Sequence, residues 1–129
     1  MPYVMIVDDS RDSVEPLARF LERSGYLVTM MTDAQEAIGE IIRRPPHVLL
    51  LDLLMPEMDG AMLLEVLRSY LRLQALPVVV LTGVPDSPMV QRVRDLNVNA
   101  VLTKGKASFQ EVEAALRLAR HHVPGPPSA

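Results

Sequence analysis

Five polar residues lie at or near the ends of short apolar runs in this chain: Asp8, Asp9, Asp52, Thr82 and Lys104. Asp52 is the most informative of them, because it interrupts the otherwise apolar run Leu49–Leu54. An ionised carboxylate inside a buried strand is unfavourable unless it is paired or bound to a cation. Asp52 is therefore the first candidate for a functional residue.

Asp8, Asp9 and Asp52 together predict a site for a divalent cation. Three carboxylates that converge repel one another and raise their own pKa values, and a bound cation offsets that repulsion. Oxygen ligands with no His or Cys nearby suit Mg²⁺ or Mn²⁺ rather than zinc. A divalent ion and the ammonium of Lys104 would balance the three negative charges.

Each of these residues also has an ordinary structural interpretation. Aspartates after strands often cap helices, so Asp8 or Asp9 alone would be assigned a structural role. Thr82 alone is a common turn residue, and Lys104 alone is a solvated surface charge. Asp52 is hardest to explain in this way. Five polar residues that all follow or end apolar runs are also far less expected by chance than any one of them.

A sheet must bring these residues together, and the apolar runs predict one. The runs are rich in Val, Leu and Ile without polar alternation, which is typical of strands covered on both faces. They occupy Tyr3–Val7, Leu27–Met31, Val48–Leu51, Val78–Leu81 and Ala100–Leu102. Helical segments separate them, which indicates an α/β class fold with a doubly wound parallel sheet. In such sheets, ligands bind beyond the carboxyl ends of the strands.

Helices are predicted between the runs, where apolar residues recur at i, i+3, i+4 and i+7. The clearest stripes are Val14, Leu17, Ala18 and Leu21; Leu63, Val66, Leu67 and Tyr70; and Val112, Ala115, Leu116 and Ala119. Weaker examples occupy residues 34–43 and 87–96. Capping-box spacing joins Asp33 to Glu36 and Ser108 to Glu111, with a looser match at Asp12 and Glu15. Gly25 and Asn97 are expected in left-handed conformations just past helix ends.

The composition is that of one ordinary globular domain, with 129 residues, 49% hydrophobic and 22% charged. A net charge of −3 argues against direct nucleic-acid binding. The absence of cysteine excludes disulfides, thiolate catalysis and Cys-ligated zinc. The stretch His47–Pro56 is too short to span a membrane, and residues 1–9 do not resemble a signal peptide. A cytoplasmic domain without a membrane partner is expected.

The polar residues after the apolar runs, together with their neighbours, resemble the receiver domain of two-component response regulators. The matching residues are Val-Asp-Asp at 7–9, Leu-Asp-Leu-Leu-Met-Pro-Glu-Met-Asp-Gly at 51–60, Leu-Thr-Gly at 81–83 and Leu-Thr-Lys at 102–104. The resemblance covers about residues 3–121 and implies a flavodoxin-like (βα)5 fold, with five strands in the order 2-1-3-4-5. It implies a domain over residues 1–122. The proline-rich residues 123–129 are expected to be a flexible tail or the start of a linker.

The resemblance also implies roles for the acidic residues. Asp52 would accept a phosphoryl group from a sensor histidine kinase or a phosphotransfer protein. Asp9 would bind Mg²⁺ or Mn²⁺ directly, and Asp8 would hold it through water. Asp52 and the backbone carbonyl of Leu54 would complete the ligands. Met-Pro at 55–56 and Asp-Gly at 59–60 would shape the loops without a direct chemical role.

Thr82 and Lys104 would contact phosphoryl oxygens, with Lys104 pairing with Asp52 beforehand. Phosphorylation adds about −1.5 to −2 charge, which can reposition the Thr82 loop. The expected output is a changed surface on the fourth helix, fifth strand and fifth helix. A downstream protein target, an output domain or a second copy in a homodimer would bind it. The only chemistry expected is phosphorylation and dephosphorylation of the chain itself.

Four positions bear on how such a switch would work. Receivers usually have Tyr or Phe three residues before the lysine, where this chain has Val101, which has no ring to swing. They usually have Pro after the lysine, where this chain has Gly105. A cis non-proline bond costs about 2.5–4 kcal/mol, so the Lys104–Gly105 bond is predicted to be trans and its loop altered. Leu54 and Val84 orient no hydrolytic water, which suggests a long-lived phosphoryl group.

Two other functions stay open. A pseudo-receiver would keep the fold as an interaction domain without using phosphate, and Val101 and Gly105 are compatible with that. A small Mg²⁺-dependent phosphohydrolase of the aspartyl-phosphate type also uses Asp, Thr and Lys on a doubly wound sheet. That group usually has an Asp-x-Asp nucleophile pattern after the first strand and a cap domain, so it fits less well.

Overall fold

The five apolar runs form one parallel sheet in the computed structural model, which describes residues 1–122. The strands are β1 (Tyr3–Val7), β2 (Leu27–Met31), β3 (Val48–Leu51), β4 (Val78–Thr82) and β5 (Ala100–Thr103). Their order, β2-β1-β3-β4-β5, confirms the predicted doubly wound topology. The tail predicted at residues 123–129 lies outside the described residues.

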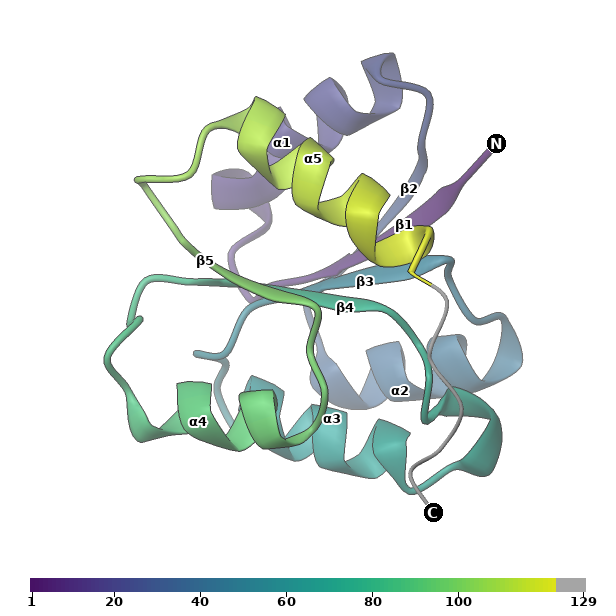
Figure 1. The fold of residues 1–129 in the computed structure, drawn as a ribbon, viewed down its shortest axis with the longest axis vertical. Helices are drawn as coiled ribbons and strands as arrows, with labels where there is room; N and C mark the ends of the chain where they lie inside the picture. The colour runs from purple at the N-terminus through teal and green to yellow at the C-terminus, as the bar shows by residue number, and fades with distance from the viewer. Residues whose placement is uncertain (123–129) are drawn as a thin grey trace.

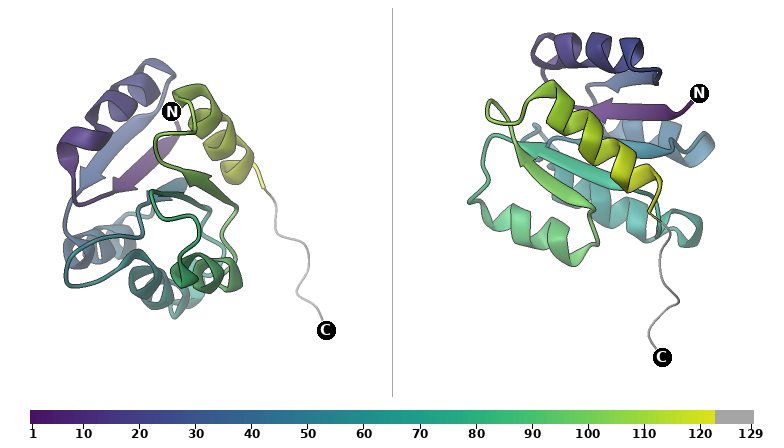
Figure 2. Two further views of the ribbon diagram at one scale, coloured as in Figure 1. Left: turned by 90° about the vertical axis from the view of Figure 1, so that its left-hand side faces the viewer. Right: turned by 45° about the horizontal axis from the view of Figure 1, so that its top comes forward.

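Helices cover both faces of the sheet and make a three-layer sandwich (Figures 1 and 2). On one face lie α1 (Arg11–Arg23) and α5 (Phe109–Arg120). On the other face lie α2 (Ala34–Arg43), α3 (Gly60–Arg68) and α4 (Pro88–Asp95). A short 3₁₀ helix, η1 (Leu71–Leu73), follows α3 and was not expected from the sequence.

The sheet separates two apolar clusters. Met5 and Val7 of β1 point toward the α2–α3–α4 side, whereas Val4 and Ile6 pack against α1 and α5. The central strands β1, β3 and β4 are buried throughout, but β2 and β5 are only partly buried. The two edge strands still contribute to the clusters on both faces, through Met31 and Val101 on one side and Val28, Met30, Ala100 and Leu102 on the other. The prediction of strands covered on both faces is therefore confirmed, and the partial exposure of β2 and β5 arises because each has a sheet neighbour on one side only.

The strand register brings the polar residues to one edge. Val7 pairs with Leu51 across β1 and β3, so the next residues, Asp8 and Asp52, leave the sheet side by side. The amide of Asp52 continues the ladder by donating to the Val7 carbonyl at 2.9 Å. Thr82 pairs with Thr103 across β4 and β5, which places Lys104 one residue beyond the end of the sheet.

Most helix caps agree with the sequence prediction. Ser108 and Glu111 form a reciprocal capping box at α5, and the Asp33 carboxylate accepts from the amide of Glu36 at α2. Gly25 and Asn97 have positive φ angles of 102° and 63°. The looser box at Asp12 and Glu15 is wrong, because α1 begins after Ser10 and Asp12 lies inside its first turn.

The apolar stripe of α3 differs from the prediction at one of its edges. Leu63 and Leu67 are buried as expected, and Leu64 is fully buried with them. Val66 is only partly buried, and Tyr70 lies beyond the end of the helix with 41% of its surface exposed. The helix contacts α2 and α4, and its buried residues share one apolar cluster with strand residues, so its contact face includes Leu64 rather than Tyr70.

Arg68, the last residue of α3, ties three connections together. Its guanidinium donates to the carbonyls of Leu73 and Leu76 at 2.8 and 2.9 Å, and to those of Leu96 and Asn97 at 2.9 and 3.3 Å. Leu96 and Asn97 form the end of α4, so one side chain holds the ends of α3 and α4 and the segment around η1 in place. Burial lowers the pKa of Arg68 from its usual value.

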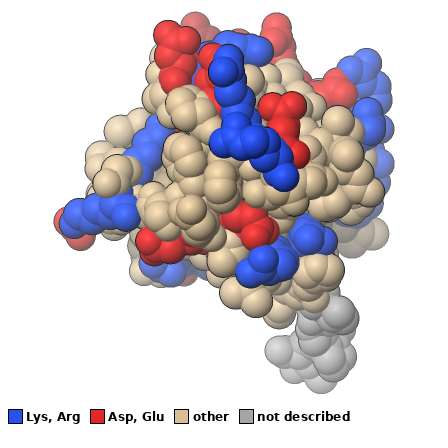
Figure 3. All heavy atoms as spheres, turned by 90° about the horizontal axis from the view of Figure 1, so that it is seen from above, with Lys and Arg blue, Asp and Glu red and all other residues tan. Residues whose placement is uncertain are grey.

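The surface over α1 and α5 has basic and acidic side chains interspersed, without a continuous basic stripe on this face (Figure 3). Within residues 1–122, no helix is both long enough and apolar enough to span a membrane.

Candidate functional site

Three carboxylates meet at the carboxyl ends of β1 and β3. One oxygen from each of Asp8, Asp9 and Asp52 can be chosen so that all three lie within 4.8 Å of one another. Asp8 and Asp52 are 3% and 6% exposed, whereas Asp9 is exposed. The parallel register makes this convergence possible, because β1 and β3 are adjacent although Asp52 comes 44 positions after Asp8 in the chain.

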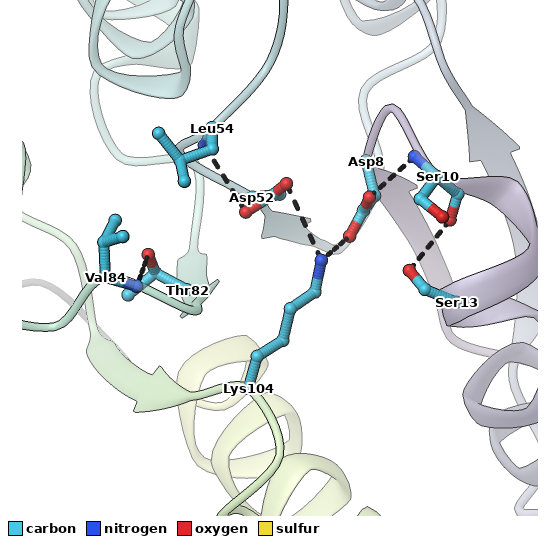
Figure 4. Close-up of polar contacts among 8 residues, drawn as sticks. All are labelled: Asp8, Ser10, Ser13, Asp52, Leu54, Thr82, Val84 and Lys104. Atoms are coloured by element: carbon cyan, nitrogen blue, oxygen red, sulfur yellow. Dashed lines mark hydrogen bonds and ion pairs between the residues drawn. The ribbon is translucent and has the colours of Figure 1, made fainter.

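Lys104 reaches this cluster from the end of β5 (Figure 4). Its Nζ atom donates to Oδ2 of Asp8 at 2.6 Å and lies 3.7 Å from Oδ2 of Asp52. The family resemblance implied a pairing with Asp52; both carboxylates lie within ion-pair distance, and the shorter contact is with Asp8. The lysine side chain is 29% exposed, so it is partly accessible to solvent while its ammonium contacts the two buried carboxylates.

A backbone amide fixes the other oxygen of Asp8. The N–H of Ser10, the N-cap residue of α1, donates to Asp8 Oδ1 at 2.9 Å (Figure 4). This contact was not foreseen, because a backbone donor leaves no signal in the residue type. Asp8 is thus held on both oxygens, by Ser10 and by Lys104, and its position is set before any ligand arrives.

The pKa of Asp52 is raised to about 6. Burial is the main cause, and the neighbouring Asp8 carboxylate adds to it, while the Lys104 ammonium acts in the opposite direction. For Lys104, burial acts to lower the pKa, but the hydrogen bond to Asp8 and the nearby carboxylates outweigh it, so that its pKa is raised. The site therefore holds more negative charge than its one lysine neutralises.

This donor set fits a small divalent cation. It offers carboxylate oxygens only, and Asp9 is its exposed member. Hard oxygen ligands of this kind suit Mg²⁺ or Mn²⁺. A divalent charge would favour the ionised form of Asp52, whose pKa is raised by burial and by the neighbouring Asp8 carboxylate. Leu54, whose carbonyl is expected from the family resemblance to bind the cation, is adjacent to the cluster: its amide nitrogen lies 3.4 Å from Asp52 Oδ1.

Thr82 ends β4 on the same edge and is fully buried. Its hydroxyl oxygen accepts a hydrogen bond of 3.0 Å from the amide of Val84 (Figure 4). A hydroxyl has one proton to donate besides its acceptor positions, so the Thr82 proton remains available to another oxygen. Thr82 therefore links the β4–α4 loop to the end of the sheet at which the three carboxylates meet.

The two atypical positions lie in β5 and just after it. Val101 is partly buried and packs into the apolar cluster on the α4 side of the sheet, together with Met89 and Leu96. Gly105 has a φ of 81°, a conformation that residues with a side chain rarely adopt. The peptide bond between Lys104 and Gly105 is trans, which confirms the prediction made from the missing proline.

Comparison with known proteins identifies one family for this chain. Residues 4–119 match the family described as the response regulator receiver domain. Response regulator RR06 of Streptococcus pneumoniae is 34% identical over 101 residues, which are 78% of this chain and 45% of that protein. The probable chemotaxis protein CheY of Rhizobium etli is 31% identical over 121 residues, covering 88% of this chain and 94% of that one.

A solved structure agrees with the fold. A putative response regulator from Chloroflexus aurantiacus superposes with a TM-score of 0.86 at 27% identity, covering 95% of this chain and 100% of that one. The chain spans less than half the length of RR06, so RR06 has sequence beyond the part matched here.

Proposed function

Because this chain belongs to the response regulator receiver domain family, we propose that it is a phosphorylation-dependent switch of a two-component system, with Asp52 as its phosphoacceptor. Receiver domains are signalling modules, and the chemistry proposed here takes place on the chain itself. Its phosphoryl donor would be a sensor histidine kinase or a phosphotransfer protein, and its location the cytoplasm. The observation that supports the proposal best is the convergence of three carboxylates and Lys104 at one sheet edge.

Asp52 would act as the nucleophile. With a pKa of about 6, its carboxyl group is largely ionised near neutral pH. One carboxylate oxygen forms a bond to phosphorus while the P–N bond of the donor's phosphohistidine breaks. The electron pair of that bond stays on the imidazole nitrogen, which takes up a proton and leaves as histidine. The product on this chain is an acyl phosphate.

The carboxylates of Asp9 and Asp52 and the carbonyl of Leu54 would hold Mg²⁺ or Mn²⁺ directly, with Asp8 acting through water. When bound, the cation supplies positive charge to the phosphoryl oxygens, over which negative charge spreads in the transition state. Asp8, fixed by Ser10 and Lys104, would orient that water without moving itself.

Lys104 and Thr82 would stabilise the transferred group. The ammonium of Lys104 lies 3.7 Å from Asp52 and can follow the added negative charge on its flexible stem. The Thr82 hydroxyl would donate its free proton to a second phosphoryl oxygen. Because Val84 donates to the same hydroxyl, a shift of Thr82 pulls on the β4–α4 loop.

The output would be a changed surface on α4, β5 and α5, bound by a downstream protein, an output domain or a second copy of the chain. Val101 packs beneath α4 in this surface and carries no ring that could change rotamer. The displacement would therefore pass from Thr82 through the β4–α4 loop to α4, without the aromatic residue that receivers usually have.

The direct test is incubation with Mg²⁺ and phosphoramidate followed by intact mass spectrometry. We expect one adduct of about 80 Da, the mass of a phosphoryl group, in the wild-type chain and none in Asp52→Asn. Asp86→Asn changes an exposed aspartate of the β4–α4 loop and should label normally. Absence of any adduct would favour a pseudo-receiver, and continuous release of phosphate from substrate would favour a phosphohydrolase.

A further inference from the structure

The loop between β3 and α3 begins at Asp52, and a hydrogen bond joins its two ends. Leu53 follows Asp52 and is fully buried, and its carbonyl accepts a hydrogen bond of 3.0 Å from the amide of Gly60. Asp59 caps α3 by accepting from the amide of Met62 at 2.8 Å. The first turn of α3 therefore returns to the start of the loop, and the residues between, including Leu54, are held at both ends.

Gly60 makes this return possible because it has no side chain. A Cβ atom at this position would lie 2.4 Å from the backbone oxygen of Asp52 and 2.9 Å from the Cα of Leu53. Both are backbone atoms, so a flexible side chain cannot relieve the clash. Any other residue must push the start of α3 away from the end of β3, or move the backbone of Asp52 itself.

The other glycines within residues 1–122 have no comparable constraint. A Cβ atom at Gly25, Gly39, Gly83 or Gly105 would meet no atom within 4 Å. Two of these, Gly25 and Gly105, are explained by a positive φ angle instead. Gly60 is thus the described glycine at which space is the constraint, and the space is bounded by the acceptor residue.

We propose that Gly60 is a positioning residue for the acceptor site: it lets α3 clamp the backbone of Asp52 and Leu53, and so sets the carboxylate of Asp52 and the carbonyl of Leu54 relative to Asp8 and Asp9. Functional groups must be held within roughly 0.5 Å of a productive arrangement, and a clash with backbone atoms moves them by a comparable amount. This inference rests on the proposed function.

The test compares three variants by isothermal titration with Mg²⁺ and by the rate of labelling with phosphoramidate. In Gly60→Ala, Mg²⁺ affinity is expected to fall about 10- to 100-fold, the range seen when a residue that supports metal ligands is replaced. Labelling at saturating Mg²⁺ should slow as well. Gly39→Ala makes the same chemical change inside α2, where space is open, and should leave both values unchanged.

Leu21→Ala is the control for a loss of stability alone. Leu21 is fully buried in the last turn of α1. This turn lies near the amino ends of the strands, whereas Asp52 lies at their carboxyl ends. Its replacement leaves a core cavity and should keep Mg²⁺ affinity within about twofold at a temperature where the variant is folded. Wild-type affinity in Gly60→Ala, or an equal loss in Leu21→Ala, would overturn the inference.

A measurement on the unmodified chain covers the case in which Gly60→Ala does not fold. If Gly60 positions the site, Mg²⁺ binding should stabilise its hydrogen bond to Leu53, and amide exchange at Gly60 should slow by NMR while exchange at Gly39 is unchanged. Equal exchange at Gly60 with and without Mg²⁺ would refute the inference. Failure of the wild-type chain to bind Mg²⁺ or to label would instead contradict the proposed function.

Discussion

Lys104 is hydrogen-bonded to Asp8 at 2.6 Å and lies 3.7 Å from Asp52, so the one ammonium of the site neutralises Asp8 more than Asp52. Asp52 is buried with little compensation, and its raised pKa follows from that arrangement. Asp52 is therefore the group in the site that gains most from a cation or from a proton.

A double-mutant cycle can test this order of pairing. Without Mg²⁺, Lys104→Met and Asp8→Asn are expected to show a coupling energy of about 1–2 kcal/mol in urea unfolding, because they share a short hydrogen bond between charged groups. Lys104→Met and Asp52→Asn should couple more weakly. A larger coupling with Asp52 would mean that the ammonium pairs chiefly with Asp52 rather than with Asp8.

The pH dependence of stability should identify Asp52. Its folded pKa, about 6, is above the ordinary value of 3.8, so the folded chain holds the proton more tightly than the unfolded chain does. The stability contribution of Asp52 therefore decreases as pH rises from about 4 to about 6 and stays low above that.

Removal of the charge should reverse this loss. In EDTA at pH 7.5, Asp52→Asn is expected to be more stable than the wild type by about 2–3 kcal/mol, and the difference should nearly vanish at pH 4. Urea unfolding at both pH values measures it, with Asp86→Asn as the control. A wild type that is more stable than Asp52→Asn at pH 7.5 would contradict the raised pKa.

Mg²⁺ should stabilise the folded chain through Asp9. At about a hundredfold excess over its dissociation constant, a ligand that binds only the folded state adds about 2.7 kcal/mol. Asp9→Asn should lose most of this gain, whereas Asp12→Asn, an exposed aspartate in the first turn of α1, should retain it. Urea unfolding at constant ionic strength measures the gain, and an equal gain in both variants would argue against a cation at Asp9.

Gly105→Pro, which installs the residue usual in the family, should destabilise this chain. Gly105 has a φ of 81°, whereas proline fixes φ near −65°. We expect a loss of about 2 kcal/mol or more in chemical unfolding. Gly105→Asn should lose less, since asparagine tolerates left-handed conformations better. Wild-type stability in Gly105→Pro would show that the loop has a second conformation of similar energy.

The lifetime of the proposed acyl phosphate should depend on Leu54. Its side chain is 49% exposed beside the acceptor and offers no group to orient water. Leu54→Asn is expected to speed loss of the label several-fold, measured by mass spectrometry after the donor is removed. Leu71→Asn changes a leucine that is 83% exposed on η1 and should have no effect. An unchanged rate in Leu54→Asn would show that this position does not control the entry of water.

The sequence predicted well those features that depend on the chemical type of a residue. The apolar runs gave all five strands, and Asp52 stood out because a carboxylate does not belong in such a run. Contacts made by the backbone were not predictable. The amide of Ser10 bonds to Asp8 whatever its side chain, and the space at Gly60 depends on where α3 returns. The preference of Lys104 for Asp8 is a difference between contacts of 2.6 and 3.7 Å, which residue spacing does not encode.

The contacts of Arg68 have a mechanical consequence for α4. Four carbonyl oxygens accept from its guanidinium, and two of them belong to Leu96 and Asn97 at the far end of that helix. The N-terminal end of α4 is joined to Thr82 by the short β4–α4 loop. A displacement at Thr82 would therefore rotate α4 about its C-terminal end, which Arg68 holds in place. Its first turn would then travel farther than its last.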